Sequence, residues 1–212
     1  MRIVRFTPKE TAGLGNDPLF GVLNDKDELL VLKGDPIYQG IVPTQSTVNL
    51  AEVKVLAPVL PRSKVVAIGK NYADHAAEMN SAVPDEPIIF LKPNTSVAGP
   101  GDTITWPAMA QSVDYEGELA IVISRICKDV PKERYADVIF GYTIANDVTS
   151  RDLQKKDGQW TRAKGFDTFL SPRSLHRCFR SAPLRARLCK LDCGREDPGG
   201  LRAKPLASER GP

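Results

Sequence analysis

Short apolar runs separated by turn-forming residues recur along most of the chain and predict a mainly β protein with a few short helices. In the first part, runs rich in leucine, isoleucine and valine indicate strands at residues 3–6, 19–23, 28–32 and 53–56. The polar residues 24–27 form a hairpin connection between the second and third of these strands. Because no pattern of chemistry-bearing residues appears in residues 1–57, we interpret this part as a small β-rich N-terminal unit for packing or dimerisation.

A longer second part alternates strand-like and helix-like segments. Apolar, β-branched runs predict strands at residues 63–69, 88–91, 119–123 and 138–145. Helix propensity is higher at residues 73–79, 131–137 and 148–154. The apolar content of the runs at residues 88–91, 119–123 and 138–145 predicts that these strands are buried.

Three acidic residues lead into the third of these strands. Asp114, Glu116 and Glu118 alternate along the chain and would point to one side of an extended segment. Carboxylates at a buried strand cost several kcal/mol unless a positive charge compensates them. With no Lys or Arg between them, they indicate a hard divalent cation held by oxygen ligands. The alternative is a strand end that emerges into solvent with hydrated acids.

Another acid follows the strand at residues 138–145. Asp147 precedes a segment with helix propensity, where it either joins a metal site or caps the helix by accepting a backbone N–H. Arg151 and Gln154 are spaced to share one helix face with it. Lys164 follows a polar loop. Basic groups beside a metal suit a substrate with carboxylate and keto or enol oxygens.

His75 and Glu78 are spaced three residues apart in a predicted helix and would share its face. A carboxylate in contact with an imidazole can orient the ring and raise its basicity, which suits general acid–base work. The alternative is an incidental pair on a surface helix. His75 is the only histidine before residue 170.

The composition changes near residue 170. Residues 1–170 carry 19 basic and 22 acidic residues, whereas residues 171–212 carry 10 basic and 4 acidic residues. The later segment shows no sustained periodicity and is rich in Arg, Pro, Gly and Ser. We interpret residues 170–212 as an aberrant, disordered basic tail of the kind that a reading-frame shift produces.

Two functional interpretations of this tail remain. Its charge could bind nucleic acid, but the Arg residues are scattered among Pro and Gly with one aromatic residue. A zinc site could use His176, Cys178, Cys189 and Cys193, but their spacing matches no common zinc framework. We favour neither.

No apolar run approaches the ~20 residues of a membrane helix. The N-terminal residues form a predicted strand and lack the features of a secretory signal. We therefore expect a cytoplasmic protein without membrane partners.

Five motifs together resemble the fumarylacetoacetate hydrolase family, in their order and spacing. They lie at residues 69–75, 90–93, 114–119, 146–154 and 164–167. The resemblance covers roughly residues 1–169 and is strongest to the bacterial, two-part branch of acylpyruvate hydrolases and 2-hydroxyhepta-2,4-diene-1,7-dioate isomerases. It implies a mixed α/β, mainly β fold and a homodimer. Residues 58–169 would then form a β-roll catalytic domain that lacks its C-terminal strands, behind the N-terminal domain of residues 1–57.

The resemblance also implies a metal site. Glu116, Glu118 and Asp147 would hold Mg²⁺, or Mn²⁺ or Ca²⁺, and Asp114 becomes a neighbour. Asn71 stands where fumarylacetoacetate hydrolase proper has a further acidic ligand. This difference indicates the acylpyruvate hydrolase, decarboxylase or isomerase side of the family, with more coordination positions left to water and substrate.

The remaining roles implied by the resemblance concern proton transfer and substrate binding. His75 with Glu78 would activate water or move a proton, and Lys164 would hold or polarise the oxyanion of the substrate. Arg151 and Gln154 would contact the substrate.

The expected function is that of a divalent-metal-dependent hydrolase or lyase of small 2-oxo acids. The reaction would be acylpyruvate-type C–C hydrolysis, or related decarboxylation or isomerisation, as in the breakdown of aromatic compounds. The alternative is a truncated, inactive fragment, because loss of C-terminal strands would leave unpaired edges and an exposed apolar face. Nucleic-acid binding through the tail is a weaker alternative.

Overall fold

The computed structural model describes residues 1–72, 84–172 and 175–176. Two sets of sequence predictions therefore lie outside the described residues: the His75/Glu78 pair and the tail cysteines Cys178, Cys189 and Cys193. The described part is mainly β with short helices, which confirms the expected fold class.

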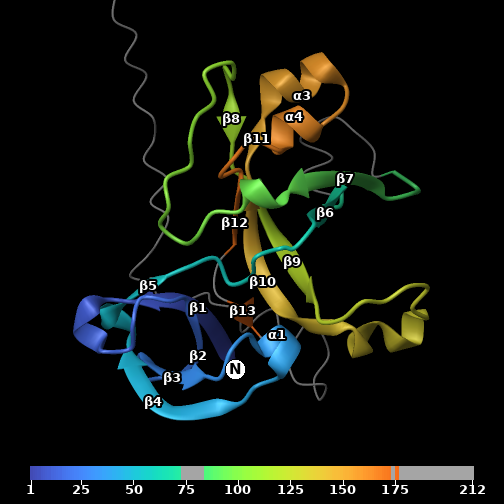
Figure 1. Ribbon diagram of the computed structural model, residues 1–212. Helices are drawn as coiled ribbons and strands as arrows, with labels where there is room; N and C mark the ends of the chain where they lie inside the picture. The colour runs from blue at the N-terminus through green and yellow to red at the C-terminus, as the bar shows by residue number, and fades with distance from the viewer. Residues whose placement is uncertain (73–83, 173–174, 177–212) are drawn as a thin grey trace, which may run out of the picture.

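The N-terminal strands form a strongly curved antiparallel group (Figure 1). They are β1 (Arg2–Pro8), β2 (Leu19–Leu23), β3 (Glu28–Leu32), β4 (Pro43–Asn49) and β5 (Val53–Val55). Their buried apolar residues, among them Val4, Phe6 and Leu29, form one core cluster. Strand β4 was not predicted, because its sequence is largely polar and only Val48 is buried. The helix α1 (Pro36–Gln39) begins after Asp35, whose side chain accepts a hydrogen bond from the N–H of Ile37.

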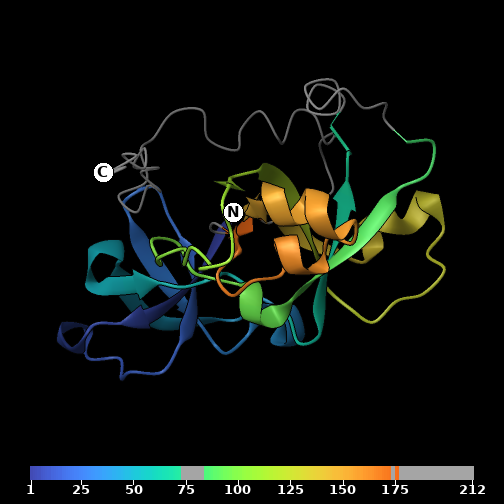
Figure 2. The same cartoon turned by 90° about the horizontal axis from the view of Figure 1, so that it is seen from above.

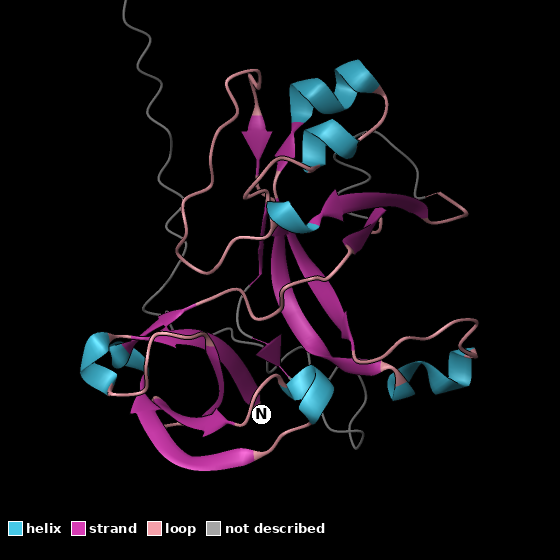
Figure 3. Cartoon of the chain, in the orientation of Figure 1, coloured by secondary structure: helices cyan, strands magenta, loops and turns pink. Residues whose placement is uncertain are grey.

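The centre of the molecule is the long strand β10 (Ile139–Asp147), which pairs antiparallel with β9 (Gly117–Ile123) and with β12 (Leu170–Pro172) (Figure 3). The short strand β13 (Leu175–His176) pairs with β10 at Tyr142 and with β1 at Arg2 and Ile3. It thereby joins the N-terminal strands and the central strands into one sheet. Both β12 and β13 lie in the segment that we interpreted as the tail.

Smaller elements surround the upper end of β10. Strands β6 (Lys64–Gly69) and β7 (Ile88–Pro93) form an antiparallel hairpin, and β8 (Val113–Asp114) pairs with β11 (Thr149–Ser150). Helices α3 (Arg151–Asp157) and α4 (Thr161–Lys164) follow β11 and lie together near β7 (Figures 1 and 2). Single-turn 3₁₀ segments complete the described structure at Glu10–Ala12, Leu50–Glu52 and Asn94–Ser96, and a longer one covers Lys132–Asp137.

The acid-bearing segment differs from its prediction in two ways. It is not one continuous strand, because β8 pairs with β11 while β9 pairs with β10, and the chain changes partner around Glu116. It is also not fully buried. Val122 packs against the cluster of Ile3 and Phe140, but Ile121 and Ile123 on the opposite face are 52% and 49% exposed. The strand has apolar residues on both faces, and the described residues cover only one.

Asp147 does not cap the following helix. It is the last residue of β10, and Ser150 is the residue that precedes α3. The alternative interpretation of Asp147 as a helix cap is therefore wrong. Among the described helices, none is long and apolar enough to cross a membrane.

Candidate functional site

Backbone hydrogen bonds bring the two ends of the acidic region together at the end of β10. The N–H of Asp147 donates to the carbonyl of Glu116 at 2.8 Å, and the N–H of Glu116 donates to Oδ1 of Asn146 at 2.9 Å. Glu118 lies opposite Ala145 in the β9–β10 ladder. The pairing of these two strands therefore places Glu116, Glu118 and Asp147 around one point.

These three carboxylates each offer one oxygen, and the three oxygens lie within 4.8 Å of one another. Asp147 is 1% exposed, and both glutamates are partly buried. A set of carboxylate oxygens at this spacing suits a hard divalent ion such as Mg²⁺, Mn²⁺ or Ca²⁺. The structure thus brings together the three residues that the sequence resemblance selected as ligands.

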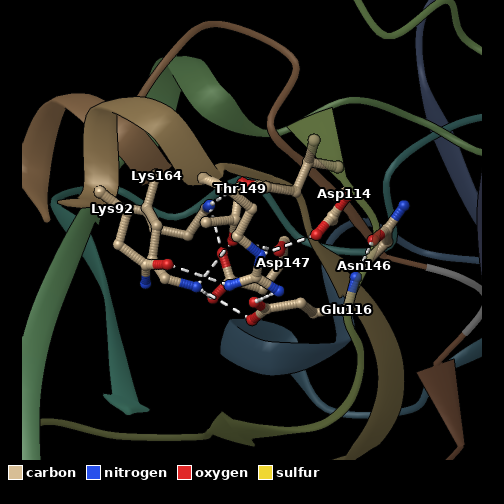
Figure 4. A network of polar contacts seen from close by, with 10 residues as sticks. Lys92, Asp114, Glu116, Asn146, Asp147, Thr149 and Lys164 are labelled. Atoms are coloured by element: carbon tan, nitrogen blue, oxygen red, sulfur yellow. Dashed lines mark hydrogen bonds and ion pairs between the residues drawn. The ribbon is translucent and has the colours of Figure 1, made fainter. Parts of the chain in front are cut away.

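Lys164 lies at the centre of the polar network. Its Nζ donates to Oδ2 of Asp147 at 2.7 Å, to Oε2 of Glu116 at 2.9 Å and to Oγ1 of Thr149 at 2.8 Å (Figure 4). Its Nζ also lies 4.9 Å from the centroid of the Phe90 ring. The lysine is 3% exposed, so these contacts replace its hydration.

Lys92 is the residue of this network that sequence reasoning missed. It is 1% exposed, and its Nζ lies 2.5 Å from Oδ1 of Asp147 and 3.4 Å from the carbonyl of Val148. Burial lowers the pKa of Lys92, and the neighbouring Asp147 only partly offsets that effect. The sequence feature that could have identified Lys92 is its position in β7. Lys92 follows the buried Phe90 by two residues, so both side chains point to the same face of the strand.

Arg151, at the first turn of α3, reaches back to the acidic segment. Its guanidinium contacts Oδ2 of Asp114 at 2.8 Å, Oε1 of Glu116 at 2.5 Å and Oε1 of Gln154 at 3.0 Å. Burial would lower the pKa of Arg151, but its bonds to Asp114 and Glu116 outweigh burial and raise it. The structure therefore brings Arg151 and Gln154 together beside the cluster, as the sequence predicted, and makes Asp114 a partner of Arg151.

The two glutamates differ in their electrostatic surroundings. For Glu116, burial would raise the pKa, but the charges and hydrogen bonds of Lys164 and Arg151 outweigh it and lower the pKa. For Glu118, burial together with the charges of Asp147 and Glu116 raises the pKa to about 7. Among the described residues, none donates a hydrogen bond to the Glu118 carboxylate. Glu118 is thus the carboxylate that most lacks a positive partner.

An open cavity of about 590 Å³ adjoins the cluster. Lys92, Glu118 and Asp147 line one part of it, and apolar residues of β6 and β9, such as Val66 and Ile121, line another. The cavity gives a small molecule access to the charged groups and offers it an apolar wall.

Most of the remaining predicted site residues lie outside the part of the chain that the structure describes. His75 and Glu78 lie outside the described residues, as do three of the four candidate zinc ligands. The fourth, His176, lies in β13.

Two family descriptions match consecutive parts of the chain. Residues 64–174 match "Fumarylacetoacetate (FAA) hydrolase C-terminal", and residues 1–58 match "Rv2993c-like, N-terminal". The first match covers every residue of the charged cluster, from Lys92 to Lys164.

Several curated proteins are similar to this chain. Protein Rv2993c of Mycobacterium tuberculosis is 62% identical over 120 residues, which is 57% of this chain and 45% of that protein. The mitochondrial oxaloacetate tautomerase fahd2 of Xenopus laevis is 46% identical over 127 residues, 59% of this chain and 40% of that protein. The chain spans about half the length of these curated relatives and of others that it matches.

Solved structures resemble the whole described fold. The 2-hydroxyhepta-2,4-diene-1,7-dioate isomerase of Mycobacterium marinum superposes with a TM-score of 0.71 at 40% identity, over 84% of this chain and 67% of that one. The names of these proteins include hydrolases, isomerases and a tautomerase.

Proposed function

Because the chain belongs to the fumarylacetoacetate hydrolase family, we propose that it is a divalent-metal-dependent enzyme of small 2-oxo acids. The reaction would be acylpyruvate-type C–C hydrolysis or a related decarboxylation or isomerisation. The observation that carries the proposal is the triad of carboxylate oxygens within 4.8 Å of one another, beside an open cavity.

The charges of the cluster support an anionic substrate. The network holds four carboxylates, Asp114, Glu116, Glu118 and Asp147, against the three cations Lys92, Lys164 and Arg151. A divalent ion would change the net charge of this group from −1 to +1 when all four carboxylates are ionised. Since the site is largely buried, such an excess favours a ligand that brings negative charge.

A divalent ion bound by these carboxylates would supply Lewis-acid stabilisation of enolate character in the substrate. We assign Lys164 to hold an oxyanion of the substrate, because its ammonium already lies beside both Glu116 and Asp147. Arg151 and Gln154 would contact the substrate carboxylate from α3. His75 with Glu78 would activate water or move a proton; this assignment rests on the sequence alone.

A specific observation also supports the alternative of a folded but inactive chain. Ile89 and Leu91 of β7 and Ile121 and Ile123 of β9 are strongly exposed, so the described residues leave apolar faces uncovered near the cavity. Such a chain could retain the cluster without a complete substrate site. A homodimer, as the family resemblance implies, would provide one way to cover these faces.

An activity assay separates the enzyme proposal from the inactive-chain alternative. The unaltered chain and Glu116→Ala are each assayed with acetylpyruvate and oxaloacetate in the presence of Mg²⁺ or Mn²⁺. We expect turnover that depends on the metal and is lost in Glu116→Ala. If both proteins are inactive and the metal does not raise the melting temperature of the unaltered chain, the enzyme proposal fails. Metal-dependent stabilisation without turnover would support the inactive-chain alternative.

A further inference from the structure

The two oxygens of the Asp147 carboxylate are held by different lysines from different elements. Lys92, on β7, contacts Oδ1 at 2.5 Å, and Lys164, at the end of α4, contacts Oδ2 at 2.7 Å (Figure 4). All three residues are at most 3% exposed. A buried carboxylate held at both oxygens cannot rotate about its last bond without losing a charge-assisted hydrogen bond.

The two lysines differ in their other contacts. Lys164 also reaches Glu116 and Thr149, so its ammonium stands between two of the three proposed metal ligands. Among described residues, the other hydrogen bond recorded for Lys92 goes to the carbonyl of Val148. Lys92 therefore donates to one of the three proposed ligands, whereas Lys164 donates to two of them.

We propose that these lysines have separate roles toward the metal. Lys92 is a positioning residue: it fixes the orientation of the Asp147 carboxylate and remains bound to it when the ion enters. Lys164 occupies part of the position of the ion in the metal-free chain, is displaced from Glu116 and Asp147 on metal binding, and becomes available to the substrate. This inference rests on the proposed function.

The charge beside Asp147 does not distinguish the lysines, because each places one ammonium beside that carboxylate. The lysines differ in the other groups to which they donate hydrogen bonds. Loss of a hydrogen bond that orients a metal ligand typically reduces metal affinity about 10- to 100-fold. Loss of an ammonium that competes for the ligand oxygens increases metal affinity, since the ion no longer has to displace it.

The test compares Lys92→Met with Lys164→Met by calorimetric titration with Mn²⁺ at one pH and ionic strength. Each variant removes one positive charge beside Asp147, so the charge effect at that carboxylate cancels between them. We expect Lys164→Met to bind Mn²⁺ more tightly than the unaltered chain, and Lys92→Met to bind about 10-fold or more weakly than Lys164→Met. An equal change in both variants, or stronger binding by Lys92→Met, would overturn the proposal.

A second measurement needs no variant, and it tests the separate roles of the two lysines even if Lys92→Met does not fold. Lysine acetylation of the unaltered chain by acetic anhydride, read by mass spectrometry, is followed with and without Mn²⁺. We expect Mn²⁺ to increase the labelling rate of Lys164 and to leave Lys92 protected. No increase at Lys164, or a comparable increase at Lys92, would overturn the proposal. If the unaltered chain binds no Mn²⁺ in the calorimeter, the proposed function itself fails.

Discussion

The carboxylates of the cluster differ in how far neighbouring cations compensate their negative charge, and the charge of Glu118 is compensated least. Its pKa is raised to about 7 by burial and by Asp147 and Glu116, while Lys164 and Lys92 oppose the shift. The folded chain therefore keeps a proton on Glu118 at pH values where the unfolded chain has released it. A group with a raised pKa stabilises the fold below its unfolded value and loses that contribution as the pH rises through its folded value.

We therefore predict that the free energy of unfolding of the metal-free chain falls between pH 4.5 and pH 7 through this residue. Urea unfolding at a series of pH values, in the presence of a chelator, would measure the fall. Glu118→Gln is the control, because it cannot release a proton, and its curve should be flatter over this interval. Parallel curves for the two proteins would contradict the prediction.

Glu116 and Asp114 provide a second comparison at the residue scale. Glu116 is a proposed ligand bonded to Lys164 and Arg151, whereas the Asp114 side chain is 51% exposed and bonded to Arg151 alone among the contacts recorded. We predict that Glu116→Gln abolishes the increase in melting temperature caused by Mn²⁺.

The matched variant Asp114→Asn should retain that increase. An exposed ion pair contributes only about 0–1 kcal/mol, so its melting temperature without metal should also change little. Loss of the Mn²⁺ response in Asp114→Asn would instead make Asp114 a ligand.

The sequence located most of these residues but not Lys92. Acidic residues in an apolar context are conspicuous in a sequence, because carboxylates rarely enter a core without a reason. A single lysine at the end of a strand has an ordinary alternative, which is to extend into solvent. The hydrogen bond on which the proposed role of Lys92 rests joins β7 to β10 across 55 residues, and the local sequence pattern carries no information about it.

At the scale of elements, the position of Lys164 depends on how closely α4 approaches β7. Phe90 of β7 lies beneath Lys164 and packs edge-on against Trp160, which precedes α4. Gly165 ends the helix where an added Cβ would lie 2.4 Å from the carbonyl oxygen of Thr161. No side chain fits there unless the backbone moves.

We predict that Gly165→Ala destabilises the chain by about 1–3 kcal/mol, the usual effect of inserting atoms into a packed region. It should also reduce metal-dependent turnover, because the shift of backbone moves Lys164. Gly117→Ala is the control for stability: an added Cβ there meets nothing within 4 Å. Chemical denaturation would measure the free energy of unfolding of both variants. Equal values would show that α4 accommodates the added Cβ without loss of stability, which would contradict the prediction.

Elements were predictable where apolar pattern and turn chemistry agreed. Strands β2 and β3 were predicted with their observed bounds, because two apolar runs flank a short polar connection. Strand β4 was missed because β3 supplies its hydrogen bonds and its own side chains are mostly polar. Strand β9 was predicted as a strand but its burial was overestimated, since burial depends on what packs against it.

At the scale of the whole molecule, apolar side chains remain exposed on several strands near the cavity. Exposed fractions reach 65% at Ile89, 56% at Val66 and 52% at Ile121. Faces of this kind favour self-association or binding of a partner. In the part of the chain that the structure describes, these strands therefore carry apolar side chains that no neighbouring element covers.

We predict that the double variant Ile89→Thr/Ile121→Thr reduces concentration-dependent light scattering. Since both side chains are already more than half exposed, the melting temperature should change little. Leu29→Thr is the contrasting control, because Leu29 is 0% exposed and its replacement should destabilise the core by several kcal/mol. Unchanged scattering by the double variant would show that these residues do not drive association.

Strand β13 has a consequence for the order of folding during synthesis. Its residues pair with Arg2 and Ile3 in β1 and with Tyr142 in β10. The N-terminal hairpins have only short loops to close and can form while translation continues. The join through β13 has to await residue 176, and a contact between such distant segments forms slowly. In a nascent chain, the strand pairing that joins the N-terminal strands to β10 through β13 would therefore form after the N-terminal hairpins.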